Sequence, residues 1–271
     1  MKKAVEPYII ALDMDGTLLN SKKEICFKTA RYLRKLSKQG HKVIISSGRP
    51  IRSIERYYNQ LKLDTLVIGY NGELIYSPND PTFEPIRHTL DKDMIKEIIE
   101  KVGKNSLNFM CETDDEIWID KEDSYLANFF WYKNMNVHKG EMKDILDKNT
   151  MTFLMHVPEE YRNAGEIEEI TKKWSDIIPI FWIGKPYLEI HHNYTSKGAA
   201  LKTIAEYYNI PKERVIAFGD ATNDIEMFEF AKTSVMMSNS KWDLSKYTIM
   251  KSVKDNNHDG IMHTLKKILS E

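Results

Sequence analysis

Two aspartates follow the first apolar segment of the chain. Residues 8–12 are apolar, Asp13 and Asp15 come next, and Gly16 follows them. An apolar run of this length predicts a strand buried on both faces, and the glycine predicts a turn. At this spacing the two side chains point to one side of the strand if its pitch continues. Because close carboxylates repel, the pair indicates a bound cation or a shared proton; an ordinary Asp-Gly turn is the alternative.

Acidic and amide side chains also follow a later apolar segment. Asp220 comes after the predicted strand 214–218, and Asn223 and Asp224 stand one short turn further on. In a doubly wound sheet the ligand crevice lies beyond the carboxyl ends of the strands, so these groups are expected to meet Asp13 there. Oxygen ligands with no His or Cys nearby favour Mg²⁺, which also takes phosphate as a ligand. A helix N-cap at 220–224 is the alternative.

Two further positions predict an anion site. Ser47 and Gly48 follow the predicted strand 42–45 and offer a hydroxyl and an unhindered backbone N–H. Lys197 follows Ser196, a predicted N-cap, and therefore lies in the first turn of a helix, where a cation is disfavoured by the helix dipole. A lysine there is either an exposed residue or the partner of an anion bound at the helix end.

The elements that carry these residues alternate between strand and helix. Apolar segments predict strands at 8–12, 42–45, 66–68, 74–76, 214–218, 234–237 and, as an edge strand, 247–249; helical periodicity predicts helices at 24–39, from 51 through 58, at 197–208, 224–231 and 261–269. This order predicts an α/β fold with a doubly wound, mostly parallel Rossmann-like sheet.

A mixed segment interrupts this alternation. The breaker cluster at 77–81 suggests a boundary, and strands are predicted at 107–111, 117–119, 151–157, 178–183 and 187–190, with helices at 91–102, 122–134 and 159–174. We therefore expect a core of residues 1–82 and 188–271 with an inserted α+β domain of residues 83–187.

Composition restricts the classes of partner. The 271 residues include 39 basic and 40 acidic ones, so the net charge is -1. No segment predicts a basic face for nucleic acid, and none approaches the length of a membrane span. The only cysteines, Cys26 and Cys111, form no metal or disulfide pattern, which favours a cytoplasmic protein. We expect a monomer or small homo-oligomer without nucleic-acid or membrane partners.

Four motifs in this order resemble those of the haloacid dehalogenase-like phosphohydrolases, and the closest match is the Cof-type branch, which carries a large inserted cap. The residues that carry the resemblance are Asp13-Met14-Asp15-Gly16-Thr17-Leu18, Ser47-Gly48-Arg49, Lys197-Gly198 and Gly219-Asp220-Ala221-Thr222-Asn223-Asp224. The segment Met237-Ser238-Asn239-Ser240 departs from the Met-Gly-Asn-Ala that is common in the family.

The resemblance implies a role for each matched residue. Asp13 would be the nucleophile that forms an aspartyl-phosphate, and Asp15 the general acid and base, with a raised pKa in the substrate complex. Mg²⁺ would be held by Asp13, the backbone carbonyl of Asp15, Asp220 and Asp224. Ser47, Gly48, Lys197 and Asn223 would hold the phosphoryl group.

The resemblance implies a Mg²⁺-dependent phosphatase for a small phosphorylated metabolite, such as a sugar phosphate. Two other functions stay open: a phosphotransferase or phosphomutase of the same fold, and a non-catalytic switch protein that is phosphorylated on Asp13. Arg49 is either a phosphate or cap contact or the partner of a core acid. A zinc site at His191 and His192 is disfavoured, because adjacent strand residues point to opposite faces.

Overall fold

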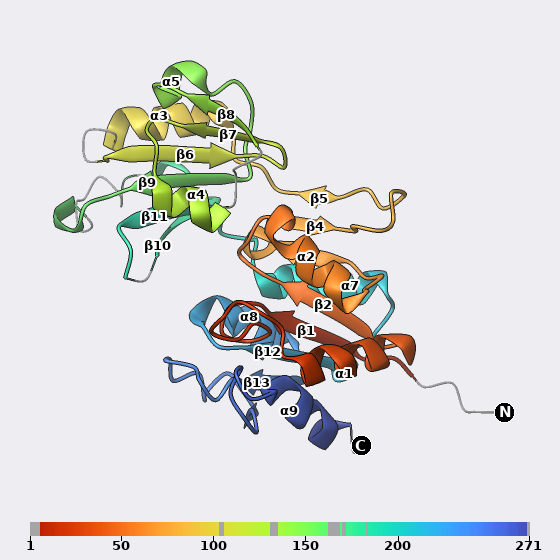
Figure 1. The fold of residues 1–271 in the computed structure, drawn as a ribbon. Coiled ribbons are helices and arrows are strands. Elements are labelled where there is room, and N and C mark those ends of the chain that lie inside the picture. The colour runs from red at the N-terminus through yellow and green to blue at the C-terminus, as the bar shows by residue number, and fades with distance from the viewer. Residues whose placement is uncertain are drawn as a thin grey trace. The chain divides into compact units, whose positions relative to one another are not determined.

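The computed structural model describes residues 6–102, 106–130, 135–161, 169, 172–182 and 184–269. The chain divides into two compact units (Figure 1). Unit 1 comprises Met1–Ile86 and Ser196–Glu271, and unit 2 comprises Arg87–Thr195. The expected division of the chain at residues 83 and 187 stays a prediction.

Unit 1 is built on one eight-stranded sheet with the order β14-β13-β12-β1-β2-β3-β4-β5. Neighbouring strands from β14 to β3 are parallel, and β3 and β4 form an antiparallel pair. The strands are β1 (Ile9–Asp13), β2 (Lys42–Ser46), β3 (Val67–Gly69), β4 (Leu74–Tyr76), β5 (Ile86–Arg87), β12 (Val215–Gly219), β13 (Thr233–Met236) and β14 (Met250–Lys251). The predicted doubly wound, mostly parallel α/β fold is confirmed.

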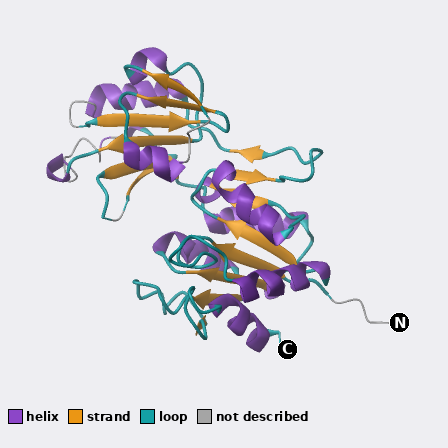
Figure 2. Ribbon diagram, in the orientation of Figure 1, coloured by secondary structure: helices purple, strands orange, loops and turns teal. Residues whose placement is uncertain are grey.

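Helices cover both faces of this sheet (Figure 2). One apolar cluster joins Ile10 and Leu12 to helices α1 (Phe27–Lys38), α2 (Ile51–Leu61) and α9 (Gly260–Ile268). The alternate residues Ile9 and Ala11 pack with α7 (Lys197–Tyr207) and α8 (Ile225–Phe230) in a second cluster. Because successive strand residues face opposite sides, β1 needs apolar residues on both faces up to Leu12, and all of its residues are buried.

The register of the central strands sets the position of the polar residues. Leu12 of β1 lies opposite Phe218 of β12, and Asp13 lies opposite Ser46 of β2. The carboxyl ends of the three strands therefore meet at one edge, as expected for parallel neighbours. The fold thus brings together, at one edge of the sheet, strand ends that are about 200 residues apart in the sequence.

Most predicted elements of unit 1 are present, with shifted ends. Helix α1 begins at Phe27 rather than at residue 24, with Cys26 as its N-cap. The predicted edge strand at 247–249 is wrong, because the strand that pairs with β13 is β14, Met250–Lys251. The two-residue strand β5 was not predicted, because so short a segment has no periodic pattern.

Unit 2 contains a six-stranded sheet with the order β10-β11-β9-β6-β7-β8. All neighbours are antiparallel except β7 and β8. The elements are α3 (Lys92–Val102), β6 (Asn108–Glu112), β7 (Glu116–Ile119), α4 (Ser124–Phe130), β8 (Asn136–Lys139), α5 (Met142–Ile145), β9 (Thr152–His156), η3 (Glu159–Tyr161), β10 (Ile177–Phe181) and β11 (Tyr187–His192). The predicted helix at 159–174 lies largely outside the described residues. Among the described residues, no helix has the length and apolar character needed to cross a bilayer.

Candidate active site

Lys197 joins two carboxylates at the carboxyl edge of the unit 1 sheet. Its Nζ donates to Oδ1 of Asp13 at 2.5 Å and to Oδ1 of Asp224 at 2.7 Å. The side chains of Lys197 and Asp224 are fully buried, and Asp13 is nearly so. Ser196 caps the helix by accepting a hydrogen bond from the backbone N of Ala199, which confirms that Lys197 starts α7.

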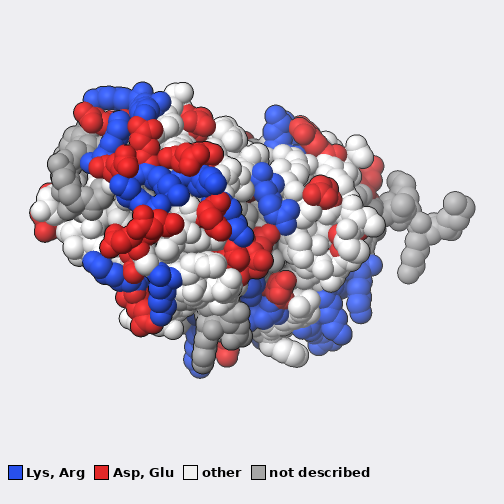
Figure 3. Space-filling view, turned by 90° about the horizontal axis from the view of Figure 1, so that it is seen from above, with Lys and Arg blue, Asp and Glu red and all other residues white. Residues whose placement is uncertain are grey.

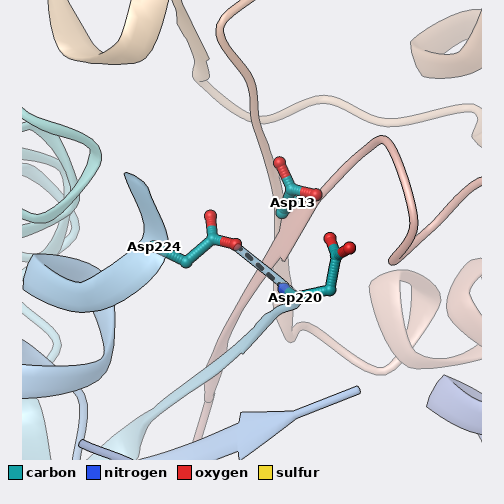
Figure 4. Close-up of side chains that lie close together, drawn as sticks. All are labelled: Asp13, Asp220 and Asp224. Carbon is teal, nitrogen blue, oxygen red and sulfur yellow. Dashed lines mark hydrogen bonds between the residues drawn. The ribbon is translucent and has the colours of Figure 1, made fainter. Parts of the chain in front are cut away.

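Asp220 completes a group of three acids. Each of Asp13, Asp220 and Asp224 offers one carboxylate oxygen within 4.8 Å of the other two. Figure 4 shows the three side chains grouped around the end of β1. Asp224 is the last residue of η5 (Thr222–Asp224), and its Oδ2 accepts hydrogen bonds from the backbone N atoms of Asp220 and Ala221. One oxygen of Asp224 thus stabilises the turn and the other contacts Lys197. Asp224 therefore both caps the turn and takes part in the acidic group.

The charge of this group is only partly balanced. Burial raises the pKa of Asp13 well above its ordinary value, and the charges of Asp224 and Asp220 raise it further against the effect of Lys197. Burial and the neighbouring Asp224 also raise the pKa of Asp220, to about 6. Lys197 stays protonated, because its two carboxylate partners outweigh its burial and raise its pKa. Three acids with one buried cation leave excess negative charge, and the donor set of oxygens fits a divalent metal ion.

Asp15 makes different contacts from Asp13. Its carboxylate accepts hydrogen bonds from Nε and Nη2 of Arg49, both at 2.7 Å, and from Nζ of Lys23 at 2.6 Å. Strand β1 ends at Asp13, so the strand pitch that would align the two acids does not continue. Arg49 is therefore the partner of an acid, one of the two roles that the sequence left open.

These contacts set the protonation of Asp15. Although burial raises the pKa of Asp15, the hydrogen bonds and charges of Arg49 and Lys23 outweigh it and lower the pKa below its usual value. The sequence-based expectation was a raised pKa in the substrate complex. The ion pairs of Asp15 act in the opposite direction, so a rise would require their loss.

The predicted anion-binding residues lie on the loops that follow β2 and β12. The backbone N of Ser47 donates to the carbonyl of Ile68, and its hydroxyl accepts from the backbone N of Arg49 at 3.1 Å. Asn223 donates to Oδ1 of Asn71 at 2.9 Å, and a Cβ on Gly48 would stand 2.9 Å from the Asn71 side chain. Asn71 thus connects the Gly48 loop to the Asn223 turn.

Two residues of this site were not assigned by the sequence. The hydroxyl of Thr17 donates to Oδ1 of Asp220 at 3.1 Å. Asn71, which has φ +54°, follows β3 in the turn that leads into β4. The Asn-Gly pair at 71–72 predicts a turn, and the structure shows this turn, but a turn signal says nothing about which side chain the asparagine contacts.

We expect Gly16 to be required for the position of Asp220. Gly16 has φ +84°, and an added Cβ would stand 2.3 Å from Oδ2 of Asp220. The substitution Gly16→Ala should therefore lower both metal affinity and the midpoint of thermal unfolding, by about 1–3 kcal/mol in stability. Gly40→Ala is the matched control, since Gly40 has φ +98° and nothing within 4 Å. Equal effects of the two substitutions would show that backbone strain alone, rather than the clash with Asp220, is responsible.

The histidine pair of unit 2 lies at the end of β11. Both His191 and His192 are buried, and Nε2 of His191 lies 3.2 Å from Oε2 of Glu189. Glu189 also accepts a hydrogen bond from Nε1 of Trp182 at 2.8 Å. The only group of three or more potential metal ligands among the described residues is the one at Asp13, Asp220 and Asp224.

The sequence matches a known protein family. The model of the haloacid dehalogenase-like hydrolase family matches residues 10–265. The chain belongs to this family. The match covers nearly the whole sequence, and the membership that the four motifs suggested is confirmed.

Curated proteins and a solved structure match this chain over nearly their whole length. The chain is 33% identical to the 5-amino-6-(5-phospho-D-ribitylamino)uracil phosphatase YitU of Bacillus subtilis (strain 168), with 98% of each chain covered. It is 27% identical to the phosphatase YcsE of the same organism, which carries the same substrate name, over 98% of this chain and 97% of YcsE. The crystal structure of TM0651 from Thermotoga maritima has a TM-score of 0.79 at 26% identity, with 97% of both chains covered. The chain is thus a phosphatase of the haloacid dehalogenase-like family.

Proposed function

We propose that the protein is a Mg²⁺-dependent phosphatase that hydrolyses a small phosphorylated metabolite through an aspartyl-phosphate on Asp13. The observation that carries the proposal is the buried contact of Asp13 with Lys197, beside Asp220 and Asp224. A nucleophile, a cation and an oxygen-rich acidic group at one strand edge are the parts that phosphoryl transfer requires.

The metal-binding part of the proposal assigns three carboxylates and a carbonyl. Asp13 and Asp220 would bind Mg²⁺ through their carboxylates, Asp15 through its backbone oxygen, and Asp224 would support them. All of these donors are oxygens, as Mg²⁺ prefers. When bound, the ion would supply positive charge to the phosphoryl oxygens and to the acidic group.

Four groups of the chain would hold the phosphoryl oxygens. Lys197 would exchange part of its contact with Asp13 for a contact with phosphate, as a charge-assisted hydrogen bond. The Ser47 hydroxyl and the Gly48 N–H would donate from the loop after β2. Asn223 would donate through the amide that now contacts Asn71. Once Lys197 and Asn223 have exchanged their present contacts for phosphate, the four donors would stabilise the charge that develops on the phosphoryl oxygens.

The reaction would proceed in two displacements. In the first, a carboxylate oxygen of Asp13 attacks phosphorus, the bond from phosphorus to the alkoxide of the substrate breaks, and Asp15 donates a proton to that alkoxide. In the second, Asp15 removes a proton from water, the hydroxide oxygen attacks phosphorus, and the bond to Asp13 breaks to release phosphate. The proton that Asp15 gives in the first step is thus returned in the second.

Asp15 can serve as the acid only after its surroundings change. Arg49 and Lys23 now stabilise its ionised form. A phosphate monoester near Arg49 offers that guanidinium a second anionic partner, which would weaken its hold on Asp15. We therefore place the proton uptake of Asp15 after substrate binding.

The curated relatives suggest where to search for the substrate. YitU and YcsE are both named as phosphatases of 5-amino-6-(5-phospho-D-ribitylamino)uracil, a phosphomonoester on a polyol chain. We propose a phosphorylated sugar or polyol of this kind, with that compound as the first one to test. The family match and the acidic group support the phosphatase chemistry, and the names of the relatives support the substrate class.

The experiment is phosphate release from a panel of phosphomonoesters by the purified protein. The panel contains 5-amino-6-(5-phospho-D-ribitylamino)uracil, sugar phosphates and nucleotides, each with Mg²⁺ and with EDTA. We expect turnover in plain buffer that requires Mg²⁺. Activity that is undiminished by EDTA would refute the metal dependence, and phosphate transfer to an added sugar without release would favour a phosphotransferase.

Metal binding should depend on pH. The pKa of Asp220 is raised to about 6, so its carboxyl group gains a proton as the pH falls through that value. A metal ion must then displace this proton, so the affinity for Mg²⁺ should fall by as much as about tenfold per pH unit below pH 6. Isothermal titration calorimetry at pH about 7.5 and about 5 checks this, since each bound ion should release more protons at the lower pH. An affinity that does not change over this range would contradict the role of Asp220.

A further inference from the structure

The described residues of unit 1 contain a second candidate binding site, a groove between helices α1 and α9. The two helices lie side by side on one face of the sheet (Figure 1). The groove has a volume of about 980 Å³ and combines basic with aromatic side chains. Its basic lining residues are Lys28, Arg31, Arg34, Lys35, Lys38 and Lys266.

The groove concentrates positive charge in a chain that is nearly neutral. Six of the lining residues are Lys or Arg and none is acidic, although the chain has 39 basic and 40 acidic residues. Figure 3 shows the molecule from another side, where basic and acidic side chains are interspersed over much of the visible surface. No single segment of the sequence predicts a basic face for nucleic acid. The fold adds a lysine of α9 to the five cations of α1.

The charges of α1 are not compensated within the helix. Lys28, Arg31, Lys35 and Lys38 are exposed and follow one another at spacings of three and four residues, so they lie along one side of the helix over about 15 Å. Like charges at these spacings destabilise a helix by about 0.2–0.5 kcal/mol per pair. No carboxylate of the described residues lies within salt-bridge distance of Lys28, Arg31 or Lys38. Such repulsion is relieved when an anion binds between the cations.

Three other side chains of the groove indicate what kind of anion fits. Phe27, the first residue of α1, is 78% exposed, so its ring is not buried in the apolar core. The ring of Tyr32 has Nζ of Lys266 at 5.6 Å and Nζ of Lys35 at 5.8 Å from its centroid. Burial lowers the pKa of His263, and nearby lysines, two of which line the groove, lower it further against the effect of Asp259. The groove thus offers a stacking surface beside a strip of positive potential.

We propose that the α1–α9 groove binds a nucleotide, with the phosphate chain along the cations of α1 and the base against the ring of Phe27. A linear phosphate chain matches the strip of cations, because lysine and arginine donate charge-assisted hydrogen bonds to phosphate oxygens. Base stacking on an aromatic ring accounts for the exposed Phe27. The volume of the groove is that of a small-molecule site. This inference does not depend on the proposed phosphatase activity, which uses residues on the loops after β1, β2 and β12.

The test is calorimetric titration with the non-hydrolysable nucleotide adenosine 5′-(β,γ-imido)triphosphate, with tripolyphosphate, and with adenosine, in EDTA. We expect the nucleotide to bind more tightly than tripolyphosphate, and adenosine not to bind. The double substitution Arg31→Gln with Lys38→Gln should weaken nucleotide binding by about tenfold or more. The matched control, Lys202→Gln with Lys212→Gln, removes two exposed cations outside the groove and should leave binding unchanged.

A further variant separates the ring from the charges. Phe27→Ala should weaken nucleotide binding by about fivefold or more and leave tripolyphosphate binding unchanged. Raising the salt concentration from about 50 to about 200 mM should weaken binding of both anions. Equal affinities of the groove variant and the control variant would overturn the proposal. So would stronger binding of a single-stranded oligonucleotide or of vesicles with anionic lipid than of the nucleotide, since the groove would then belong to a macromolecular surface.

Discussion

Replacing Asp13 with asparagine is expected to lower kcat by about 10⁴-fold or more, because a carboxamide cannot form the phosphoenzyme. The fold should survive the change. Because the pKa of Asp13 is raised in the folded protein, the stability that its protonated form contributes is lost as the pH rises from its ordinary value through the raised value. The asparagine side chain carries no charge that must be buried. We therefore expect a midpoint of urea unfolding equal to or above that of the wild type at neutral pH.

The measurement pairs steady-state phosphate release with urea unfolding. Asp64→Asn is the control, because Asp64 is an exposed acid of the same unit outside the site. Trapping with radiolabelled substrate and acid quench should give a phosphoprotein with the wild type and none with Asp13→Asn. Retention of full activity by Asp13→Asn would exclude the covalent route through this residue.

Replacing Lys197 with methionine is expected to cause the largest loss of stability. The side chain is fully buried between Asp13 and Asp224, and methionine fills a similar space without a charge. Removing one partner of a buried ion pair leaves uncompensated charge and costs about 3–5 kcal/mol. Turnover should fall as well, since the same ammonium group is proposed to hold the phosphoryl oxygens.

Urea unfolding and kinetics check this expectation together. Lys202→Met provides the control, because Lys202 is an exposed lysine in the same helix. The loss of stability should be smaller below the raised pKa of Asp13, where that carboxyl group carries a proton and less charge stays unpaired. An unfolding midpoint that matches the control at every pH would contradict the structural role of the ion pair.

The sequence predicts best where side-chain periodicity and chain connectivity decide the structure. The apolar segment before Asp13 identifies a strand buried on both faces, and parallel strands must bring their carboxyl ends together. The proximity of Asp13, Asp220 and Asp224 is predictable for this reason, because these residues follow two strands whose carboxyl ends must lie at the same edge. The position of Lys197 follows from Ser196, because a capping serine fixes the first residue of the helix.

Contacts within turns were not predictable in the same way. A carboxylate two residues beyond a strand points along the strand pitch only while the strand continues, and β1 stops at Asp13. Asp15 therefore binds Arg49 and Lys23, two residues that are 34 and 8 positions away in the chain. Short strands such as β5 arise from pairing to a formed sheet, and a segment of two residues holds no pattern that would reveal it.

The place of β1 in the sheet has a consequence for biosynthesis. The neighbour of β1 on one side is β12 (Val215–Gly219), so that edge of the strand has no pairing partner until about 200 further residues have left the ribosome. At about 5–20 residues per second, this leaves an apolar nascent segment waiting for tens of seconds. Unit 2 emerges in full during that interval. We therefore expect its sheet to assemble first and the Rossmann-like sheet to close last, which makes the β1 segment a natural client for a chaperone.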